Sequence, residues 1–491
     1  MPVLRGGVTA DQYNTPDIYI EELVPKVDEK PAGISGKVMG IIGQFQKGSV
    51  NDVLTVNGDA EFIEKLGDFS EQYSGSKAAW TAFKRGVKKI ICVNVRGAGA
   101  GAASLTLKDK AGTPADTLKI SYKGPGLYGN NCTVEVLAGS GVGTFKIVLK
   151  GPTTKTETYD NLTSPAMATS SINQFSKEFA AENLSSTTVT PNNNPAVLAA
   201  TKLTGGSDGT APTATHYKGT TDSSTGKKSG LELLKTSVEV TDVVTDIYVS
   251  DTMNGHMWVA AELMNWFAYL PLAVGTSVSA AITNRGAYNT EFAHLCIGHA
   301  RSKSRNWTVP VAVYDAIAHI LTPVQDGTAG FSFADVSGID VELSADDIET
   351  LTTNQVVSMG QMLNSERQLV YGMKSDFTLD SDPRFKQTYR RRVTSLLEKD
   401  YYIVMTPYRS KHISKSLLED AELVSRSYLD KALGEEIIQA YTIKFTTPEE
   451  IGNIDELIED LVIDLYNIAD KIRIRLLSAA NAIGGGEVSN G

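Results

Sequence analysis

A short alternation of apolar and polar side chains is the first strong pattern along the chain. It occupies residues 16–24 and has the period of two that is typical of a half-buried strand. Its central positions are Ile18, Tyr19, Ile20, Glu21 and Glu22. The charged stretch 25–31 has a proline at each end, which predicts an extended tether rather than a tight turn. We therefore expect a strand with no partner close to it in the sequence.

A second strand-like segment with the same period lies near the C-terminus. Its alternating residues are Ile472, Arg473, Ile474 and Arg475. The polar positions are arginines here, whereas the N-terminal segment carries Asp17 and two glutamates. Two strand-like ends of opposite charge indicate subunits that exchange strands, which is β-augmentation used for polymerisation. Pairing of both segments inside their own subunit explains the same spacing equally well.

Between these ends the period of the apolar residues changes several times. Apolar residues at helix spacing predict helices over 59–66 and 76–89, and the continuous apolar run 90–95 predicts a buried strand. Helices that lead into buried strands indicate an α/β unit. Short alternating runs separated by glycines then predict an antiparallel β unit over 105–148.

From Gly230 onward, strand and helix patterns alternate again, which predicts a mostly parallel sheet. The predicted strands cover 246–249, 268–270 and 293–297, and the predicted helices cover 255–267 and 309–321. After Asp340 the pattern becomes helical and charged. The predicted helices there cover 344–354, 386–399, 415–433 and 448–469, with one β ribbon at 440–445.

Length and composition divide the chain into several parts. A chain of 491 residues is long enough for roughly three domains. No arginine occurs from Gly97 to Asn284, so a composition boundary follows Arg96. We expect an N-terminal arm at 1–30, the first part of an α/β core at 31–96, an inserted β-rich domain at 97–215, an α/β domain at 216–340, a C-terminal domain at 341–470, and a C-terminal arm and tail at 471–491.

Charge and hydropathy exclude several classes of protein. The formal net charge of −11 disfavours a simple nucleic-acid binder, because phosphate recognition needs surplus cations. No apolar run reaches transmembrane length, and the first residues lack the apolar core of a signal peptide, so we expect assembly in a cytoplasm. The three cysteines have neither disulfide-framework nor zinc-site spacing.

Apparent chemical motifs in the chain are incomplete. The G-x-G-x-x-G match at 124–129 is followed by a strand pattern, whereas a phosphate cradle needs a helix there. The turn around Ser277 is similar to the nucleophile turn of subtilisin-like proteases, but no histidine occurs in the His-Gly-Thr setting of that family. His294 and His299 lack the spacing of a helical metal pair. We therefore predict no catalytic, cofactor-binding or metal-binding residues.

Three consecutive arginines are the most concentrated basic feature of the chain. They are Arg390, Arg391 and Arg392, and a helix pattern follows them. Positive charge at a helix start opposes the helix dipole, which predicts an acidic partner. Acidic helices such as 455–464 suit this role, so we expect an electrostatic contact between the poles of self-associating subunits.

Several of these segments together resemble the contractile tail sheath proteins of bacteriophages and related contractile injection systems. The segment 15–22, a small-residue turn at 32–35 and the apolar strand with its Lys-Gly ending at 39–48 resemble the N-terminal pattern of that family. The turns at 125–130 and 203–209 are similar to turns that flank the family's inserted domain. The arginine cluster falls in a place comparable to the basic segment that opens the family's final domain.

The resemblance implies a multidomain α/β and α+β fold: a subtilisin-like α/β domain without protease activity, an inserted antiparallel β domain, and a mixed C-terminal domain with exchanged terminal strands. It implies subunits that stack around a tail tube, each donating both arms to a sheet in a neighbour's C-terminal domain. Implied partners are further copies of the chain and the tail tube, baseplate and tail terminator proteins, without nucleic acid, membrane insertion or a cofactor. The implied location is the virion tail.

Two other classes stay open. A subtilisin-like hydrolase would use Ser277 and would need a histidine and an acid nearby in the fold. A self-assembling surface-layer protein would also polymerise, but it would require export from the cell.

Overall fold

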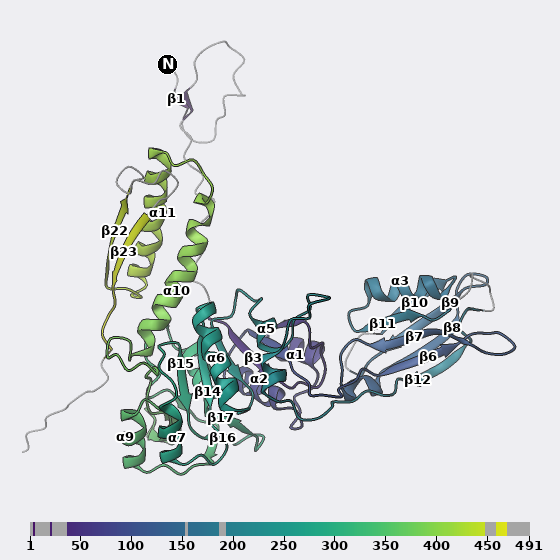
Figure 1. Ribbon diagram of the computed structural model, residues 1–491, viewed down its shortest axis with the longest axis horizontal. Coiled ribbons are helices and arrows are strands. Elements are labelled where there is room, and N and C mark those ends of the chain that lie inside the picture. The colour runs from purple at the N-terminus through teal and green to yellow at the C-terminus, as the bar shows by residue number, and fades with distance from the viewer. Residues whose placement is uncertain are drawn as a thin grey trace, which may run out of the picture.

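The computed structural model describes residues 37–152, 156–185, 193–446 and 458–468, and the backbone of residues 3–4 and 20–21. The described residues form three units (Figure 1): an α/β core at the lower centre, a β-rich module to its right, and a C-terminal unit above it. Among the described helices, none combines the length and the hydropathy needed to cross a membrane.

The α/β core is built on a six-stranded sheet that takes strands from two distant parts of the chain. Its order is β15-β14-β13-β3-β5-β4. The strands are β3 (Met39–Gly43), β4 (Val53–Val56), β5 (Ile90–Asn94), β13 (Asp242–Thr245), β14 (Phe267–Pro271) and β15 (Ala293–Cys296). All neighbours pair in parallel except β4, which runs antiparallel to β5. The mostly parallel sheet predicted from the alternating patterns is confirmed.

Helices cover both faces of this sheet, which explains why its parallel strands are continuous apolar runs. One face carries α1 (Asp59–Leu66), α2 (Ser74–Lys84) and α8 (Val311–Leu321). The other face carries α4 (Ala214–Lys218), α5 (Gly230–Leu234), α6 (Asp251–Met264), α7 (Val278–Arg285) and α9 (Ala345–Thr353). Each predicted helix in this part of the chain forms within a few residues of its expected ends.

Helix α8 is buried on nearly every side, because two small antiparallel sheets lie near its outer surface. One has the order β17-β16-β19 and the other the order β18-β21-β20. Their strands are β16 (His299–Ser302), β17 (Thr308–Pro310), β18 (Ser332–Phe333), β19 (Val336–Ile339), β20 (Met359–Leu363) and β21 (Leu369–Met373). Met359 and Met373 share an apolar cluster with α8, so the core continues past Asp340, where the sequence pattern placed a domain boundary.

The β-rich module has two antiparallel sheets and its own apolar cluster. Its strands are β6 (Ser104–Lys108), β7 (Asp116–Tyr122), β8 (Thr133–Ala138), β9 (Phe145–Lys150), β10 (Glu157–Leu162), β11 (Phe179–Asn183) and β12 (Leu198–Lys202), and helix α3 (Pro165–Phe175) packs beside them. Alternate residues of β9 are buried, as the period of two requires. The antiparallel β unit predicted over 105–148 is therefore confirmed.

Buried charged groups join this module to the core. The guanidinium of Arg96 contacts the carbonyl oxygens of Phe45 and Pro125, and it lies 3.6 Å from a carboxylate oxygen of Asp208. Asp208 also accepts hydrogen bonds from the Tyr73 hydroxyl at 2.9 Å and from the Leu127 amide at 3.1 Å. The glycine-rich loop 124–129 is therefore closed onto protein groups, and a short 3₁₀ helix leads from it into β8.

The C-terminal unit contains two long helices and a two-stranded sheet. Its elements are α10 (Thr388–Met405), α11 (Lys415–Gly434), β22 (Ala440–Thr446) and β23 (Ile458–Asp464). Helix α10 runs from the core into this unit (Figure 1). A separate apolar cluster joins the two helices to the inner face of the sheet.

Three local predictions were wrong. The strand predicted at 246–249 is β13 at Asp242–Thr245, and its first residue is a buried aspartate that the apolar pattern did not include. The helix predicted at 448–469 is, over Ile458–Asp464, the strand β23. Val462 is apolar but exposed, so the alternation of apolar inner and polar outer residues in β23 is interrupted in the sequence. The hairpin of β20 and β21 lies where a charged helical region was expected.

Most of the predicted terminal arms fall outside the described residues. This applies to Ile18, Tyr19 and Glu22 and to the whole segment 471–491. Within the described backbone, Ile20–Glu21 forms a two-residue parallel pairing with Val3–Leu4. That pairing is made inside the chain, as one of the two interpretations of the N-terminal segment expects.

A buried carboxylate connects the two halves of the core. Asp246 follows β13 and accepts hydrogen bonds from the Tyr217 hydroxyl at 2.7 Å, the Gln44 amide at 2.9 Å and the Ser74 hydroxyl at 2.5 Å. Burial raises the pKa of Asp246, and these hydrogen bonds oppose that rise. A β-carbon on Gly43 would lie 2.5 Å from the same carboxylate, so only glycine fits there.

We predict that Tyr217→Phe lowers the free energy of unfolding by about 1–3 kcal/mol, because the buried carboxylate loses a donor that water cannot replace. Thermal and urea denaturation measure the effect. The control is Tyr248→Phe, whose hydroxyl donates to Asp251 at the surface and should contribute little. Equal losses in the two variants would contradict the assignment of Asp246 as a buried connection.

Candidate functional site

The two-stranded sheet of the C-terminal unit is a candidate assembly surface. Strands β22 and β23 pair antiparallel over seven residues each, from Ala440 opposite Asp464 to Thr446 opposite Ile458. Within the part of the chain that the structure describes, neither strand has a second neighbour. Each therefore presents an outer row of backbone N–H and C=O groups to which another strand can pair.

The sheet is held on its inner face by the two long helices. Tyr441, Ile443, Leu461 and Ile463 pack against the apolar cluster of α10 and α11. The Glu459 carboxylate accepts hydrogen bonds from the Tyr401 hydroxyl of α10 and, at 3.4 Å, from the Ser425 hydroxyl of α11. Side chains on the inner face thus hold the ribbon on the helix pair and leave its outer edges open.

Large apolar side chains are exposed on the outer surfaces of the same unit. Tyr402 and Ile403 on α10, Leu423 on α11 and Val462 on β23 have from 51% to 70% of their surface accessible. Such residues on several neighbouring elements are typical of surfaces that bind another protein. Open strand edges and exposed apolar groups therefore occur together on this unit.

A buried ion pair anchors α10 to the α/β core. The side chain of Arg392 is 5% exposed, and its Nη2 lies 3.0 Å from Oδ1 of Asp242, the first residue of β13. The Tyr269 hydroxyl donates to the same oxygen at 2.7 Å. Arg392 also donates to the carbonyl oxygen of His319 at 3.4 Å. An arginine of the C-terminal unit therefore satisfies a carboxylate at the end of the core sheet where β13 begins.

Neighbouring groups set the charge states at this anchor. Burial would raise the pKa of Asp242, but Arg392 and the Thr241 and Tyr269 hydroxyls hold it below its usual value. Burial lowers the pKa of Lys37 to about 8 and that of Lys399 to about 8. Both lysines donate to core carbonyl oxygens, of His319 at 2.8 Å and of Val240 at 2.7 Å respectively.

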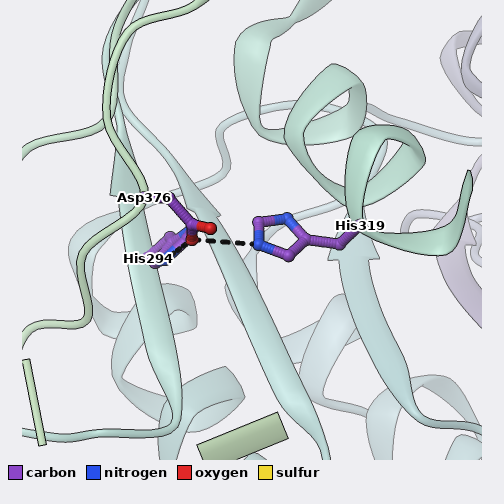
Figure 2. Close-up of side chains that lie close together, drawn as sticks. All are labelled: His294, His319 and Asp376. Atoms are coloured by element: carbon purple, nitrogen blue, oxygen red, sulfur yellow. Dashed lines mark hydrogen bonds and ion pairs between the residues drawn. The ribbon is translucent and has the colours of Figure 1, made fainter. Parts of the chain in front are cut away.

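Two histidines and two aspartates form a buried cluster next to the anchor. His294 lies on β15, His319 on α8, and Asp376 between β21 and α10 (Figure 2). Asp315 also lies on α8. Asp315 lies 2.7 Å from Nδ1 of His294 and 3.2 Å from Nδ1 of His319. Oδ1 of Asp376 lies 3.5 Å and 3.1 Å from the two Nε2 atoms. The hydroxyl of Thr388, the first residue of α10, lies 2.6 Å from Nε2 of His294.

Opposite charges dominate the electrostatics of this cluster. Burial would lower the pKa of His319, but the carboxylates of Asp376 and Asp315 raise it to about 9. Burial would raise the pKa of Asp315, but the two histidines lower it to about 2. The same histidines, with the Thr328 amide, hold the pKa of Asp376 far below its usual range.

The three consecutive arginines point to different surroundings, because neighbours on a helix are about 100° apart. Arg392 is buried, which differs from the surface position that the sequence analysis expected for it. Arg391 lies at the joint, 3.4 Å from Glu291 and 3.0 Å from Glu398. Arg390 donates to Asn467 beyond β23 at 3.0 Å. The acidic partners of Arg391 and Arg392 thus lie within the same chain.

Ser277 and His299 have local structural roles. The Ser277 hydroxyl caps helix α7 by accepting a hydrogen bond from the Ala280 amide at 3.3 Å. Buried His299 lies 3.4 Å from the Asp340 carboxylate. The spacing along the chain associates His294 only with His299 and gives no sign of its contacts with His319 and Asp376. The only available signal was the presence of all three residue types, because distant segments bring them together.

No family model and no curated protein matches this sequence. Solved structures match it over most of its length. A sheath tail protein, Lin1278 from Listeria innocua, is 13% identical with a TM-score of 0.63, over 88% of this chain and 92% of that chain. The contracted sheath complex of an extracellular contractile injection system, PVC, is 12% identical with a TM-score of 0.53, over 97% of this chain and 99% of that chain. This chain has the sheath-protein fold.

The protein of the contracted helical sheath of the anti-feeding prophage has the same fold. It is 11% identical with a TM-score of 0.53, over 95% of this chain and 100% of that chain. The likeness to sheath proteins therefore extends across the core, the β-rich module and the C-terminal unit. Within this sheath-protein fold, the Arg392 anchor fixes where the open β22-β23 sheet lies relative to the core.

We predict that Arg392→Leu destabilises the protein by about 3–5 kcal/mol, because it leaves the Asp242 carboxylate buried and unpaired. Adding Asp242→Asn should recover part of that loss by removing the orphaned charge. Arg384→Leu is the control, since it breaks an exposed pair with Asp382 and should leave the melting temperature unchanged. Similar melting temperatures for Arg392→Leu and Arg384→Leu would refute a buried anchor.

Proposed function

We propose that this protein is the structural subunit of a contractile tail sheath, which polymerises around a tail tube and contracts to drive the tube through a host envelope. The observation that carries the proposal is the sheath-protein fold over almost the whole chain. The open edges of the C-terminal sheet support it, because a helical polymer needs a repeated site of self-association.

The proposed connection between subunits is strand exchange. A two-stranded sheet is marginally stable alone, and β22-β23 has outer edges to which further strands can pair. Residues 16–24 of one neighbour and 471–476 of another would lie side by side along one of these edges and extend the sheet to four strands, with Asp17, Glu21 and Glu22 near Arg473 and Arg475. The two-residue pairing of Ile20–Glu21 with Val3–Leu4 is short enough to be displaced by this exchange.

Contraction is proposed as a collective rigid-body change between two packings of the subunits. Its energy would reside in the interfaces, with arms that keep neighbours linked while the subunits rotate. The buried Arg392–Asp242 pair suits this role, because it holds the sheet that receives the arms on the α/β core. Motion of the core would then be passed directly to the neighbours.

The rest of the assembly follows from the same proposal. The partners would be the tail tube, baseplate and tail terminator proteins, in a virion tail assembled in the host cytoplasm. The α/β core would have a subtilisin-like fold without hydrolytic activity. Ser277 as a helix cap supports this assignment over a hydrolase, because its hydroxyl is bonded to its own helix.

We predict that deletion of residues 1–24 leaves a folded protein that does not form tubes, because the open sheet loses one of its two donated strands. Negative-stain microscopy and analytical ultracentrifugation measure assembly, and circular dichroism measures folding. Ser277→Ala is the control and should assemble normally. Long hollow tubes from the deletion variant would disprove the arm model, and hydrolytic activity lost in Ser277→Ala would favour the hydrolase alternative.

We also predict that reversing one set of arm charges weakens assembly and that reversing both sets restores it. Glu21→Lys with Glu22→Lys places like charges together, as does Arg473→Glu with Arg475→Glu. Combining all four substitutions recreates opposite charges. The critical concentration for tube formation, measured by pelleting, should rise in each double variant and return toward the original in the quadruple variant. If the quadruple variant does not recover, the two charged segments do not contact each other in the assembly.

A further inference from the structure

The buried histidine cluster brings two carboxylates and two imidazoles together. Asp242 is paired with Arg392, which leaves Asp315 and Asp376 facing two imidazoles. Binding of a cation at the Nε2 atoms requires neutral imidazoles, and the two carboxylates then carry a charge of about −2 in a site nearly closed to water. The Asp376 side chain is 8% exposed, and Asp315 is fully buried. Charge of about +2 at this point would balance the cluster.

The two imidazoles are held in an orientation that suits a metal ion. Nδ1 of His294 lies 2.7 Å from the carboxylate of Asp315, and Nδ1 of His319 lies 3.0 Å from the main-chain carbonyl oxygen of the same residue, so each Nδ1–H has an acceptor. With the protons on Nδ1, both Nε2 atoms carry lone pairs, and they lie 3.5 Å and 3.1 Å from Oδ1 of Asp376 (Figure 2). The Thr388 hydroxyl, 2.6 Å away, is the hydrogen-bond partner of Nε2 of His294. A carboxylate that accepts from the rear nitrogen of a histidine is the usual support of metal-binding imidazoles.

The distances between these atoms match a set of metal ligands. One ligand atom from each of His294, His319 and Asp376 lies within 4.8 Å of the other two. Ligands at about 2.0–2.2 Å from a tetrahedral zinc ion lie about 3.3 Å from one another. The Asp376 oxygen lies 3.1 Å and 3.5 Å from the two Nε2 atoms. The longer separation is poor for a hydrogen bond but normal between two ligands of one ion.

We propose that His294, His319 and Asp376 bind a divalent transition-metal ion, and that zinc is the ion their chemistry fits best. Two imidazole nitrogens and a carboxylate oxygen are preferred zinc ligands, and a divalent ion neutralises the two buried carboxylates. The hydroxyls of Thr388 and Thr328 border the same space and supply further oxygen atoms.

A metal ion at this point would connect three segments of the chain beside the start of α10. His294 belongs to β15, His319 to α8, and Asp376 to the segment that leads into α10, whose first residue is Thr388. The ion would therefore strengthen the joint beside the Arg392 anchor. This inference does not depend on the proposed sheath function.

The first test measures metal in the full-length protein, expressed without a histidine tag and purified without chelator. We expect about one zinc ion per chain, measured by inductively coupled plasma mass spectrometry. Dialysis against chelator should lower the melting temperature by about 5 °C, and zinc chloride should restore it. Cobalt added to the chelator-treated protein should give visible absorption bands typical of low-symmetry coordination by nitrogen and oxygen. The cobalt spectrum is recorded on the protein without substitutions, so this test does not depend on whether a variant folds.

Matched variants locate the site. His294→Gln and Asp376→Asn should lose the bound metal and the cobalt bands. His299→Gln should retain both, because this buried histidine faces Asp340 outside the cluster. Protein that contains no metal as purified and does not respond to zinc, cobalt or manganese would overturn the proposal, leaving a network of hydrogen bonds alone. Full metal content in both ligand variants would overturn it as well.

Discussion

The buried pair of Arg392 and Asp242 is the interaction on which the joint between the core and the C-terminal unit depends. Asp242 begins a core strand and is 1% exposed, so its charge needs a partner from inside the protein. That partner comes from a helix 150 residues later in the chain. Since neither charge is tolerable alone, the first turns of α10 are tied to the end of the sheet where β13 begins. The pairing thereby helps to set where α11 and the β22-β23 sheet lie relative to the core.

In the C-terminal unit, the inner face of the sheet is packed on the helices, whereas the outer strand edges are unpaired within the described residues. Its two helices and the inner face of β22-β23 form a closed apolar cluster, and Glu459 adds polar contacts to both helices. The outer edges of the strands have no neighbour within the described residues. An element that must accept strands from other subunits requires this combination, because a fully paired sheet offers no backbone groups to an incoming strand.

The β-rich module is inserted in the sequence between the first and second parts of the core. It has its own apolar cluster, and its connecting segments are held by Arg96, Asp208 and Tyr73. The core can therefore bring β3 and β13 side by side although more than 190 residues separate them (Asp242 lies opposite Met39). Charged groups at both joints, Arg96 and Arg392, connect units whose apolar clusters are separate.

The sequence by itself determined the elements whose period is local: the buried strands β5, β14 and β15, the helices α1, α2, α6 and α8, and the antiparallel module. It did not locate β13 or β23, because Asp242 and Val462 occupy positions where only tertiary contacts explain a charge inside or an apolar residue outside. The resemblance in short segments identified the sheath fold before any contact was known. Tertiary structure alone decided the partners of Arg392 and the meeting of His294, His319 and Asp376, because no spacing along the chain encodes contacts between segments that only folding brings together.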